Sequence, residues 1–426
     1  MLQQTTSSAK RLKAGKMLEY AIFAVTFVVF LIAAVIYLYP GSSKPSSIPG
    51  LDPTTEEDGN VSDIARAGSL HEFLLDLHKQ FGSIASFWMG QKFVVSIHSP
   101  ELFKQHQNVF DRPPELFKLF EPFIGTASIQ YANGKDGRNR RNHYDKPLSH
   151  ESLKQYYNDF QEVANELEKK WSTLVKEEHI PLSQYMSAFA LKIVLRALFG
   201  QSFKDDKEVL EFRRNYDICW SEMERNLTEP AEPGSQRQKV FEEAYSVIKN
   251  IMENIIKHRK ENPPKENEDK LLVDVILETV TSESQKFDDC ITFAVGGLHT
   301  TGNALTWCFY FLATHPEVQD KVYKEIKKEL GNNDVDFKNI NDLRFDPDRF
   351  SPENVKSRPA MAFQPFGFAG KRICPGYRFA YAEATVCLVT LLRKFKVNMV
   401  EGQVVNPVHG LVTHPEDEIW ITIEKR

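Results

Sequence analysis

The stretch of sequence that decides the fold reads Phe363-Gln364-Pro365-Phe366-Gly367-Phe368-Ala369-Gly370-Lys371-Arg372-Ile373-Cys374-Pro375-Gly376. A lone cysteine in a long chain is most often a small buried hydrophobe. Here Cys374 follows a loop rich in Gly and Phe and precedes a segment with helical spacing, Tyr377 to Lys394, with Pro375 at a position favoured in first turns. Backbone N–H groups at the start of a helix stabilise negative sulfur and lower the pKa of a cysteine. The stretch therefore predicts a thiolate that is a strong metal ligand.

Composition sets the broad class of the protein. The chain has 426 residues, of which 42% are hydrophobic and 26% charged, which is typical of a globular protein with large cores. A net charge of -5 and the absence of a basic run interleaved with aromatics give no reason to expect nucleic acid. The five cysteines have no paired spacing, so we expect neither a disulfide framework nor a zinc site of the CxxC type. The body is expected to lie in a reducing compartment.

The N-terminal region predicts a membrane anchor. The uncharged, mostly apolar run from Tyr20 to Tyr39 is 20 residues long, enough to span a hydrocarbon core of roughly 30 Å. A cleaved signal peptide is the alternative, but the run is longer than the usual apolar region of about 7 to 15 residues. Pro, Gly and Ser then form a hinge that cannot continue the helix. We predict a tail at 1–19, a transmembrane helix at 20–39, a hinge at 40–53 and one large domain at 54–426.

The orientation of this anchor is contested within the sequence. Four basic residues between 10 and 16 precede the span, and only Lys44 follows closely, which favours a lumenal body. Initiation at Met17 would remove that bias and allow a body in the cytosol, which we expect for a single-pass protein of the endoplasmic reticulum. Glycosylation sequons at Asn60 and Asn226 would be open to modification only in a lumenal body.

The rest of the chain predicts a mainly α fold with a small β-sheet region. Two β-rich stretches, Ser83 to Trp88 and Lys92 to Ile97, are separated by a short turn and predict a hairpin. Apolar positions recur at helical spacing in four further segments. These predicted helices cover 151–180, 183–199, 206–225 and 237–260.

The cysteine stretch resembles the haem-binding loop of the cytochrome P-450 superfamily. That loop has Gly four before the cysteine, Arg two before, Gly two after, then Ala and Glu along the next helix. Six positions of this chain match: Gly370, Arg372, Cys374, Gly376, Ala380 and Glu383. The family's aromatic, seven before the cysteine, is replaced by Gly367 with Phe366 and Phe368 beside it. The resemblance implies haem b with iron on Cys374, Arg372 paired with a propionate, and cofactor contacts from Phe366, Phe368, Gly370 and Gly376.

A second motif resembles the family's oxygen-activation site. The apolar segment Phe287 to Ala313 contains Gly296-Gly297-Leu298-His299-Thr300-Thr301, and glycines and a hydroxyl inside a helix loosen its hydrogen-bond ladder. The resemblance implies room for O2 and assigns proton relay to Thr300, with Thr301 beside it. The family usually has Asp or Glu where this chain has His299, so the relay would use an imidazole or water.

Three further segments extend the resemblance. His315 to Gln319 is similar to the start of the family's next helix, where Thr314 and Glu317 can form a capping box. Gly134 to Arg141 is similar to the helix that gives a Trp and an Arg to the propionates, although Gly137 replaces the Trp and leaves Arg141 as donor. Pro347 to Phe350 matches the loop whose Arg349 normally pairs with a Glu-x-x-Arg helix.

That Glu-x-x-Arg helix is missing from its place. Leu343-Arg344 runs straight into Phe345-Asp346, and Thr300 and Cys374 are only 74 positions apart, from 300 to 374. We therefore expect an incomplete cytochrome P-450 fold that lacks a helix and several strands between Leu343 and Phe345. The start of the anchor and the last seven residues are most similar to family 20 of the superfamily, whose members have no assigned substrate.

The resemblance implies a monooxygenase that inserts one oxygen atom of O2 into a lipophilic small molecule. Electrons would come from a reductase, taken to be NADPH-dependent, that docks on basic residues around the cysteine loop: Arg138, Arg140, Lys146, Lys371, Arg372 and Arg378. The expected pocket walls are Arg112 to Asn133, the helix near Phe293, and His409 to Thr413. An impaired or inactive haem-binding membrane protein is the alternative, and a lumenal protein without haem is a third.

Overall fold

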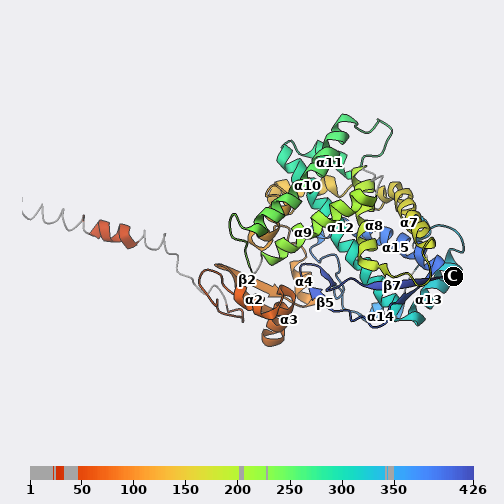
Figure 1. Ribbon diagram of the computed structural model, residues 1–426. Coiled ribbons are helices and arrows are strands. Elements are labelled where there is room, and N and C mark those ends of the chain that lie inside the picture. Colours follow the sequence, from red (N-terminus) through yellow and green to blue (C-terminus); the bar gives the residue numbers. More distant parts are fainter. Residues whose placement is uncertain are drawn as a thin grey trace, which may run out of the picture. The chain divides into compact units, whose positions relative to one another are not determined.

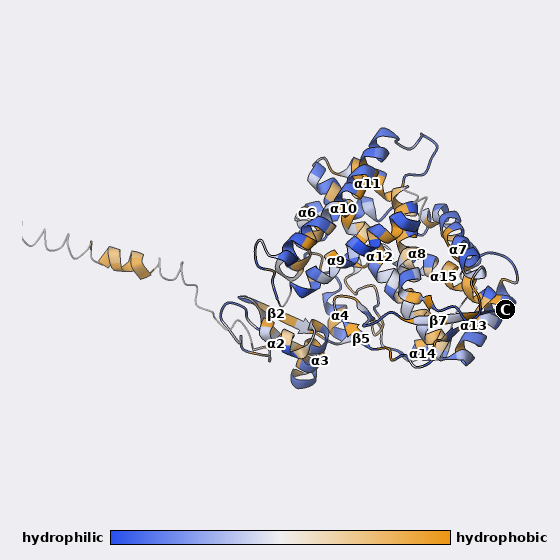
Figure 2. Cartoon of the chain, viewed as in Figure 1, coloured by the Kyte–Doolittle hydropathy of each residue, from blue (hydrophilic) through white to orange (hydrophobic). Residues whose placement is uncertain are grey.

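The computed structural model describes residues 23, 25–32, 47–200, 206–226, 229–340, 343 and 350–426. It divides into two compact units, residues 1–48 and 49–426. In the first unit, residues 23 and 25–32 are helical, and their large apolar side chains are exposed. Figure 2 shows this piece as mostly hydrophobic. The remainder of the predicted anchor, the basic residues before it and Met17 lie outside the described residues.

The second unit is mainly helical, with small sheets at its periphery (Figure 1). Its helices are α2 Val61–Ala67, α3 Leu70–Phe81, α4 Pro100–His106, η1 Pro114–Phe120, α5 Glu121–Ile124, α6 Gly134–Tyr144, η2 Ser152–Tyr156, α7 Tyr157–Ser172, α8 Leu182–Phe199, α9 Asp206–Arg225, α10 Gln236–Glu261, α11 Leu272–Thr279, α12 Glu283–Thr314, α13 Pro316–Glu329, α14 Pro352–Ser357, η5 Gly370–Arg372 and α15 Tyr377–Lys394. Its strands are β1 Ile84–Met89, β2 Lys92–Ile97, β3 Ile180–Pro181, β4 Phe395–Met399, β5 Pro407–His409, β6 Thr413–Pro415 and β7 Trp420–Lys425.

Two hydrophobic cores hold this unit together. The small core lies between α2, α3 and the antiparallel β1–β2 hairpin, and it is made by Ile64, Phe73, Leu77, Ala85 and Phe87. The large core contains most of the other buried side chains. β7, near the C-terminus, pairs antiparallel with both β3 and β4 and so closes a three-stranded sheet over the large core. β5 and β6 form a separate hairpin.

The helices α8, α12 and α15 form the centre of the large core (Figure 1). The contact between α8 and α12 is close because α12 presents Gly297, whose added Cβ would lie 2.4 Å from Val194 Cγ2. Next to these helices, Trp171 is fully buried and meets Phe309 and Phe395 edge-on at 6.2 and 6.0 Å between ring centroids. Among the described helices, α8 alone is long and apolar enough to cross a membrane, but it is mostly buried in this core.

A buried polar network joins α6 to α12. Asp289 on α12 is fully buried and accepts hydrogen bonds from Tyr144 Oη at 2.6 Å and from the backbone N–H of Ile129 at 2.5 Å. Arg140 lies 3.3 Å from the same carboxylate and also pairs with Asp136 at 2.7 Å. A buried carboxylate satisfied in this way fixes α6 and the segment before it against α12.

The structure confirms most of the predicted elements and corrects others. The hairpin and the helix from Tyr377 to Lys394 are confirmed. The predicted helix at 151–180 was too long: it is divided between η2 and α7, and residues 180–181 form β3. The capping box at the start of α13 was wrong, because the Thr314 hydroxyl donates back to carbonyls of α12 and no side chain caps the helix.

The asparagine of the sequon at Asn60 is buried in the folded protein. The residue is 1% exposed, its amide donates to the carbonyl of Asp52, and its oxygen accepts the backbone N–H of Trp88. N-glycosylation would replace a hydrogen of the amide nitrogen, which is buried and hydrogen-bonded in the folded body.

Candidate functional site

The cysteine loop is held by its own backbone and by a distant loop. The backbone N–H of Cys374 donates to the carbonyl of Phe366 at 2.9 Å, and that of Gly370 donates to the carbonyl of Gln107 at 2.9 Å. Phe368 stacks on Phe103 of α4, with 4.8 Å between ring centroids. Gly367 has φ of 91°, a left-handed conformation that an aromatic residue would adopt only with strain. This explains why the family's aromatic is absent at that position.

The thiol of Cys374 lies partly buried before the start of α15. Burial raises its pKa, although a backbone hydrogen bond from Gly376 and the charge of Arg141 act in the opposite direction. The expectation of a lowered pKa was therefore wrong for the free thiol, because desolvation outweighs the helix terminus. Pro375 also lies before the N-cap Gly376 rather than in the first turn. A thiolate at this position requires a further cationic partner, which iron would provide.

Arg372 is buried beneath the cysteine loop. Its guanidinium donates to the carbonyls of Phe110 at 2.8 Å and Ile129 at 3.3 Å, and also to that of Ala132. It lies over the Phe110 ring, 4.1 Å from the centroid. Burial and three neighbouring arginines lower its pKa to about 10. The side chain is thus a desolvated cation that holds the loop at 110–133 against the cysteine loop.

Two more arginines converge on Cys374. Arg141 of α6 donates to the carbonyl of Ile373 at 2.8 Å and pairs with Asp145. Arg112 donates to Gln130 Oε1 at 2.6 Å, and its pKa is lowered by burial and by the charge of Arg141. The charge of Cys374 opposes this lowering of the Arg112 pKa, so the two groups interact electrostatically. The sequence motifs missed Arg112 as a site cation, because no short pattern surrounds it.

Gly137 stands where the family has a Trp, and the structure shows why no side chain fits. A Cβ at this position would lie 2.1 Å from the carbonyl oxygen of Ala132 and 3.1 Å from the Phe110 ring. The backbone of 110–133 therefore occupies the space that a tryptophan would need. Since Arg372 bonds the same carbonyl, the loop and the glycine form one packing arrangement.

The residues of the α12 motif lie on three different faces of the helix. The hydroxyl of Thr300 is exposed and donates to the carbonyl of Gly296 at 2.6 Å, and no atom lies within 4 Å of a Cβ added at Gly296. The hydroxyl of Thr301 is buried and donates to Glu383 Oε1 on α15 at 2.9 Å. Burial raises the pKa of Glu383 well above its usual range. Thr300 thus borders open space, whereas Thr301 links α12 to the cysteine helix.

His299 faces a different side of α12. Its ring stacks on Trp220 of α9 at 4.1 Å between centroids, and its buried Nε2 has no hydrogen-bond partner among the described residues. It lines a cavity of about 230 Å³ together with charged residues that include Asp217 and Glu418. Burial lowers the pKa of His299 to about 4, with smaller contributions from His414 and Arg213. The imidazole is therefore neutral near pH 7.

Comparison with known proteins identifies the architecture that holds these residues. The Cytochrome P450 family model matches residues 49–344 and 341–421. This chain belongs to the cytochrome P450 family. The family is one of haem-thiolate oxidoreductases of the monooxygenase type, which confirms the predicted class of enzyme and cofactor. The mainly helical fold with small sheets is also as expected.

Curated relatives of the chain agree with the prediction of family 20. The chain is 33% identical to Cytochrome P450 20A1 of Homo sapiens and 32% identical to that of Bos taurus, with 96% of this chain and 100% of each relative covered. It is 22% identical to human Cytochrome P450 4F2 over 79% of its length. The alignment with the first human protein runs over 474 positions, more than the 426 residues here, so that protein has residues without a counterpart in this chain.

The residues around Cys374 fit a haem group. Among the described residues, neither Arg112 nor Arg372 forms an ion pair with a carboxylate, although both are desolvated. Unpaired buried guanidinium groups are costly, and haem carries two propionates that would neutralise them. Cys374 beside them would supply the thiolate that the family uses as iron ligand.

We expect Arg112→Gln to lower haem retention. The substitution removes one cation from the cluster beside Cys374 but keeps a hydrogen-bonding side chain, so the fold should persist. Arg138→Gln is the matched control, because Arg138 is about half exposed and already lies 3.9 Å from Asp111. Haem per polypeptide after dialysis should fall several-fold for Arg112→Gln only. Equal haem content in both variants would contradict a propionate role for Arg112.

We also expect His299 to contribute to acid sensitivity. Its pKa is about 4 in the folded protein against an ordinary 6.5, so the unfolded chain binds more protons between these values. Stability from this group is therefore present above pH 6.5 and is lost as the pH falls toward 4, by up to about 3 kcal/mol. His299→Gln should flatten the unfolding free energy over this window, while the exposed His179→Gln should not. Parallel pH profiles for all three proteins would contradict the assignment.

Proposed function

We propose that this protein is a membrane-anchored haem-thiolate monooxygenase that inserts one oxygen atom of O2 into a lipophilic small molecule. The observation that carries the proposal is the pair of desolvated arginines near Cys374, Arg112 and Arg372, which form no ion pair among the described residues. Such a group needs an anionic partner, and haem satisfies both the cations and the thiolate. When bound, haem supplies the dioxygen chemistry.

The side chains around the site have separate roles in this proposal. Cys374 binds iron, and the backbone bonds that hold its loop keep the sulfur at a fixed position. Phe366, Phe368, Gly370 and Gly376 shape the loop against the cofactor. Thr300 Oγ1 passes protons, since its hydroxyl is exposed and keeps free lone pairs while donating to Gly296. Thr301 positions α12 through Glu383.

His299 enters the relay only as a neutral imidazole. Because its pKa is about 4, it would accept protons poorly near pH 7, and its ring lies against Trp220. We propose that protons pass from the 230 Å³ cavity to His299 and then through water to Thr300. The pocket wall expected at Phe293 is less favoured, since that ring packs edge-on against the buried Tyr144 at 5.7 Å.

The anchor at 20–39 is part of the same proposal. The exposed apolar side chains of the described helical piece, Phe23 and residues 25–32, favour contact with membrane lipid. We propose a single-pass protein of the endoplasmic reticulum with its domain at 54–426 in the cytosol, where an NADPH-dependent reductase is available. In this proposal, residues 1–19 form a tail before the anchor, and residues 40–53 form a hinge between the anchor and the domain.

The thiolate assignment is tested by Cys374→Ser. A hydroxyl stays protonated near neutral pH and binds ferric iron weakly, so the ferrous carbon monoxide complex should lose its band near 450 nm. Cys387→Ser is the matched control, because that thiol is fully buried in α15. A band that persists in Cys374→Ser, measured against total haem, would contradict the assignment.

The reductase is expected to dock on the exposed cations near the cysteine loop. Six basic residues were predicted to form this docking surface. The prediction was wrong for Arg140 and Arg372, because both are buried and bonded within the protein. The exposed ones are Arg138, Lys146, Lys371 and Arg378. Arg138→Gln with Lys146→Gln should slow reduction several-fold at low salt and less at high salt, because exposed charges mainly steer association. Reduction rates, measured by stopped flow, that do not change with these substitutions or with salt would exclude this face as the docking site of the reductase.

An impaired or inactive haem-binding protein is the second proposal, and one observation favours it. The family model matches in two pieces that meet at residues 341–344, and the relatives' alignment is longer than this chain. Both findings support a missing internal segment after Leu343. Arg344 to Arg349 lie outside the described residues. We propose that Arg349 has lost the carboxylate partner of its family loop and that one side of the haem pocket is open to water.

Restoring the segment tests this second proposal. A version of the chain with the relatives' residues inserted between Leu343 and Phe345 should hold close to one haem per polypeptide, whereas the 426-residue form should hold several-fold less. A buried cation without its partner costs about 3 to 5 kcal/mol, so the restored form should also unfold at a higher temperature. Equal haem content and equal thermal stability would show that the segment is dispensable.

A further inference from the structure

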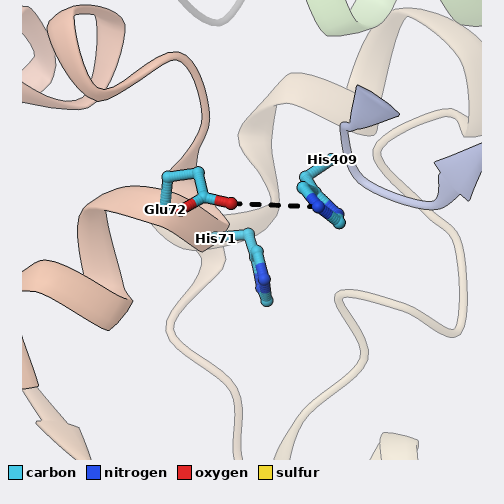
Figure 3. A group of neighbouring side chains, drawn as sticks. All are labelled: His71, Glu72 and His409. Carbon is cyan, nitrogen blue, oxygen red and sulfur yellow. Dashed lines mark ion pairs between the residues drawn. The ribbon is translucent and has the colours of Figure 1, made fainter. Parts of the chain in front are cut away.

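We propose a zinc-class metal site at His71, Glu72 and His409, far from the cysteine loop in sequence and separate from the haem chemistry. Each residue offers one ligand atom, and the three atoms lie within 4.8 Å of one another. Figure 3 shows Glu72 pointing toward His409, with the His71 ring beside them. Two imidazole nitrogens and one carboxylate oxygen form a ligand set that suits zinc and leaves a fourth position for water.

The two sides of this site come from different parts of the fold. His71 and Glu72 lie in the first turn of α3, next to its N-cap Ser69, whose side chain accepts the backbone N–H of Glu72. α3 belongs to the small core through Phe73 and Leu77. His409 ends β5, whose hairpin packs against the large core. A metal here would therefore cross-link the two hydrophobic cores.

The His409 side is held rigidly. The backbone N–H of Leu411 donates to Glu224 Oε1 at 2.7 Å, and an added Cβ at Gly410 would lie 2.3 Å from the same oxygen. The turn after His409 is thus closed onto α9. His409 Nδ1 lies 3.2 Å from Thr413 Oγ1, its register partner in the hairpin. This contact orients the ring, as the outer hydrogen bond of a metal-binding histidine does.

The remaining ring nitrogen faces the carboxylate. His409 Nε2 lies 3.8 Å from Glu72 Oε1, and the His71 and His409 rings are 4.8 Å apart between centroids. A tetrahedral zinc ion with bonds of about 2.0 Å needs ligand atoms about 3.3 Å apart. The site therefore requires a contraction of about 1.5 Å at most, which the exposed His71 side chain can supply by a change of rotamer.

A second histidine pair in the same region provides a matched comparison. The rings of His78 and His98 are 5.1 Å apart between centroids. Both ring nitrogens of His78 lie at hydrogen-bond distance from protein groups, the carbonyl of Gly82 and the hydroxyl of Ser96. No carboxylate joins this pair in any metal-ligating group of the described residues. It should not bind a metal.

The test is zinc binding to the haem-loaded full chain in detergent, measured by equilibrium dialysis against buffered free Zn²⁺. We expect one zinc per chain, and His71→Gln, Glu72→Gln or His409→Gln should each weaken binding at least about tenfold. Thr413→Val should weaken it about tenfold by freeing the ring. The control His98→Gln should bind as the parent does, and the haem spectrum should be unchanged in His71→Gln, Glu72→Gln and His98→Gln, whose residues lie outside the expected pocket walls.

A structural readout separates this site from adventitious binding. Zinc should slow backbone hydrogen exchange in 407–415 and in the first turn of α3 in the parent and in His98→Gln, but not in His409→Gln. Zinc that binds equally to the parent and the three ligand variants would overturn the proposal. Absence of stoichiometric binding, or binding without protection of 407–415, would overturn it too.

Discussion

The burial of the Arg372 guanidinium ties together the parts of the chain that make the site. Its bonds reach the carbonyls of Phe110, Ile129 and Ala132, which lie 240 to 262 residues away in sequence. Hydrogen bonds from a charged donor contribute about 1.5 to 3 kcal/mol each, and their loss would leave buried carbonyls unsatisfied. Cys374 lies two residues further along, so these bonds help to set the position of its sulfur.

The long helix α12 transmits this constraint to the rest of the body. Near its start, Asp289 binds Tyr144 and Arg140 of α6, the helix that also carries Arg141 to the cysteine loop. In its middle, Gly297 permits close approach to α8, and Thr301 bonds to α15. Proton transfer at Thr300 is thus proposed on a helix that is held by three neighbouring helices, on a face where Gly296 and Thr300 are exposed. A rigid support of this kind is what an ordered reaction centre requires.

A feature could be predicted from the sequence where its cause is local along the chain, and not where it depends on tertiary packing. The cysteine helix and the β1–β2 hairpin were predictable, because periodicity and turn residues are local signals. The cation at Arg112 was not, since its role depends on burial against residues distant in sequence. The pKa of Cys374 was predicted in the wrong direction because the helix terminus is visible in the sequence whereas desolvation is not. The burial of Asn60 likewise depended on tertiary packing.

The departures from the family pattern do not all weaken the site. Gly137 is required by the carbonyl of Ala132, which occupies the place of the family's Trp and is itself bonded by Arg372. The glycine therefore accompanies a different path of the loop at 110–133, and that path carries Arg112 to the neighbourhood of the thiol. In the proposed haem site, the guanidinium of Arg112 would therefore take the place of the neutral Trp N–H as a donor to a propionate. The ring of His299 also has a defined environment, because it stacks on Trp220 and lines a polar cavity. The choice between an active and an impaired enzyme therefore depends on the segment after Leu343, because no compensating contact for it is found among the described residues.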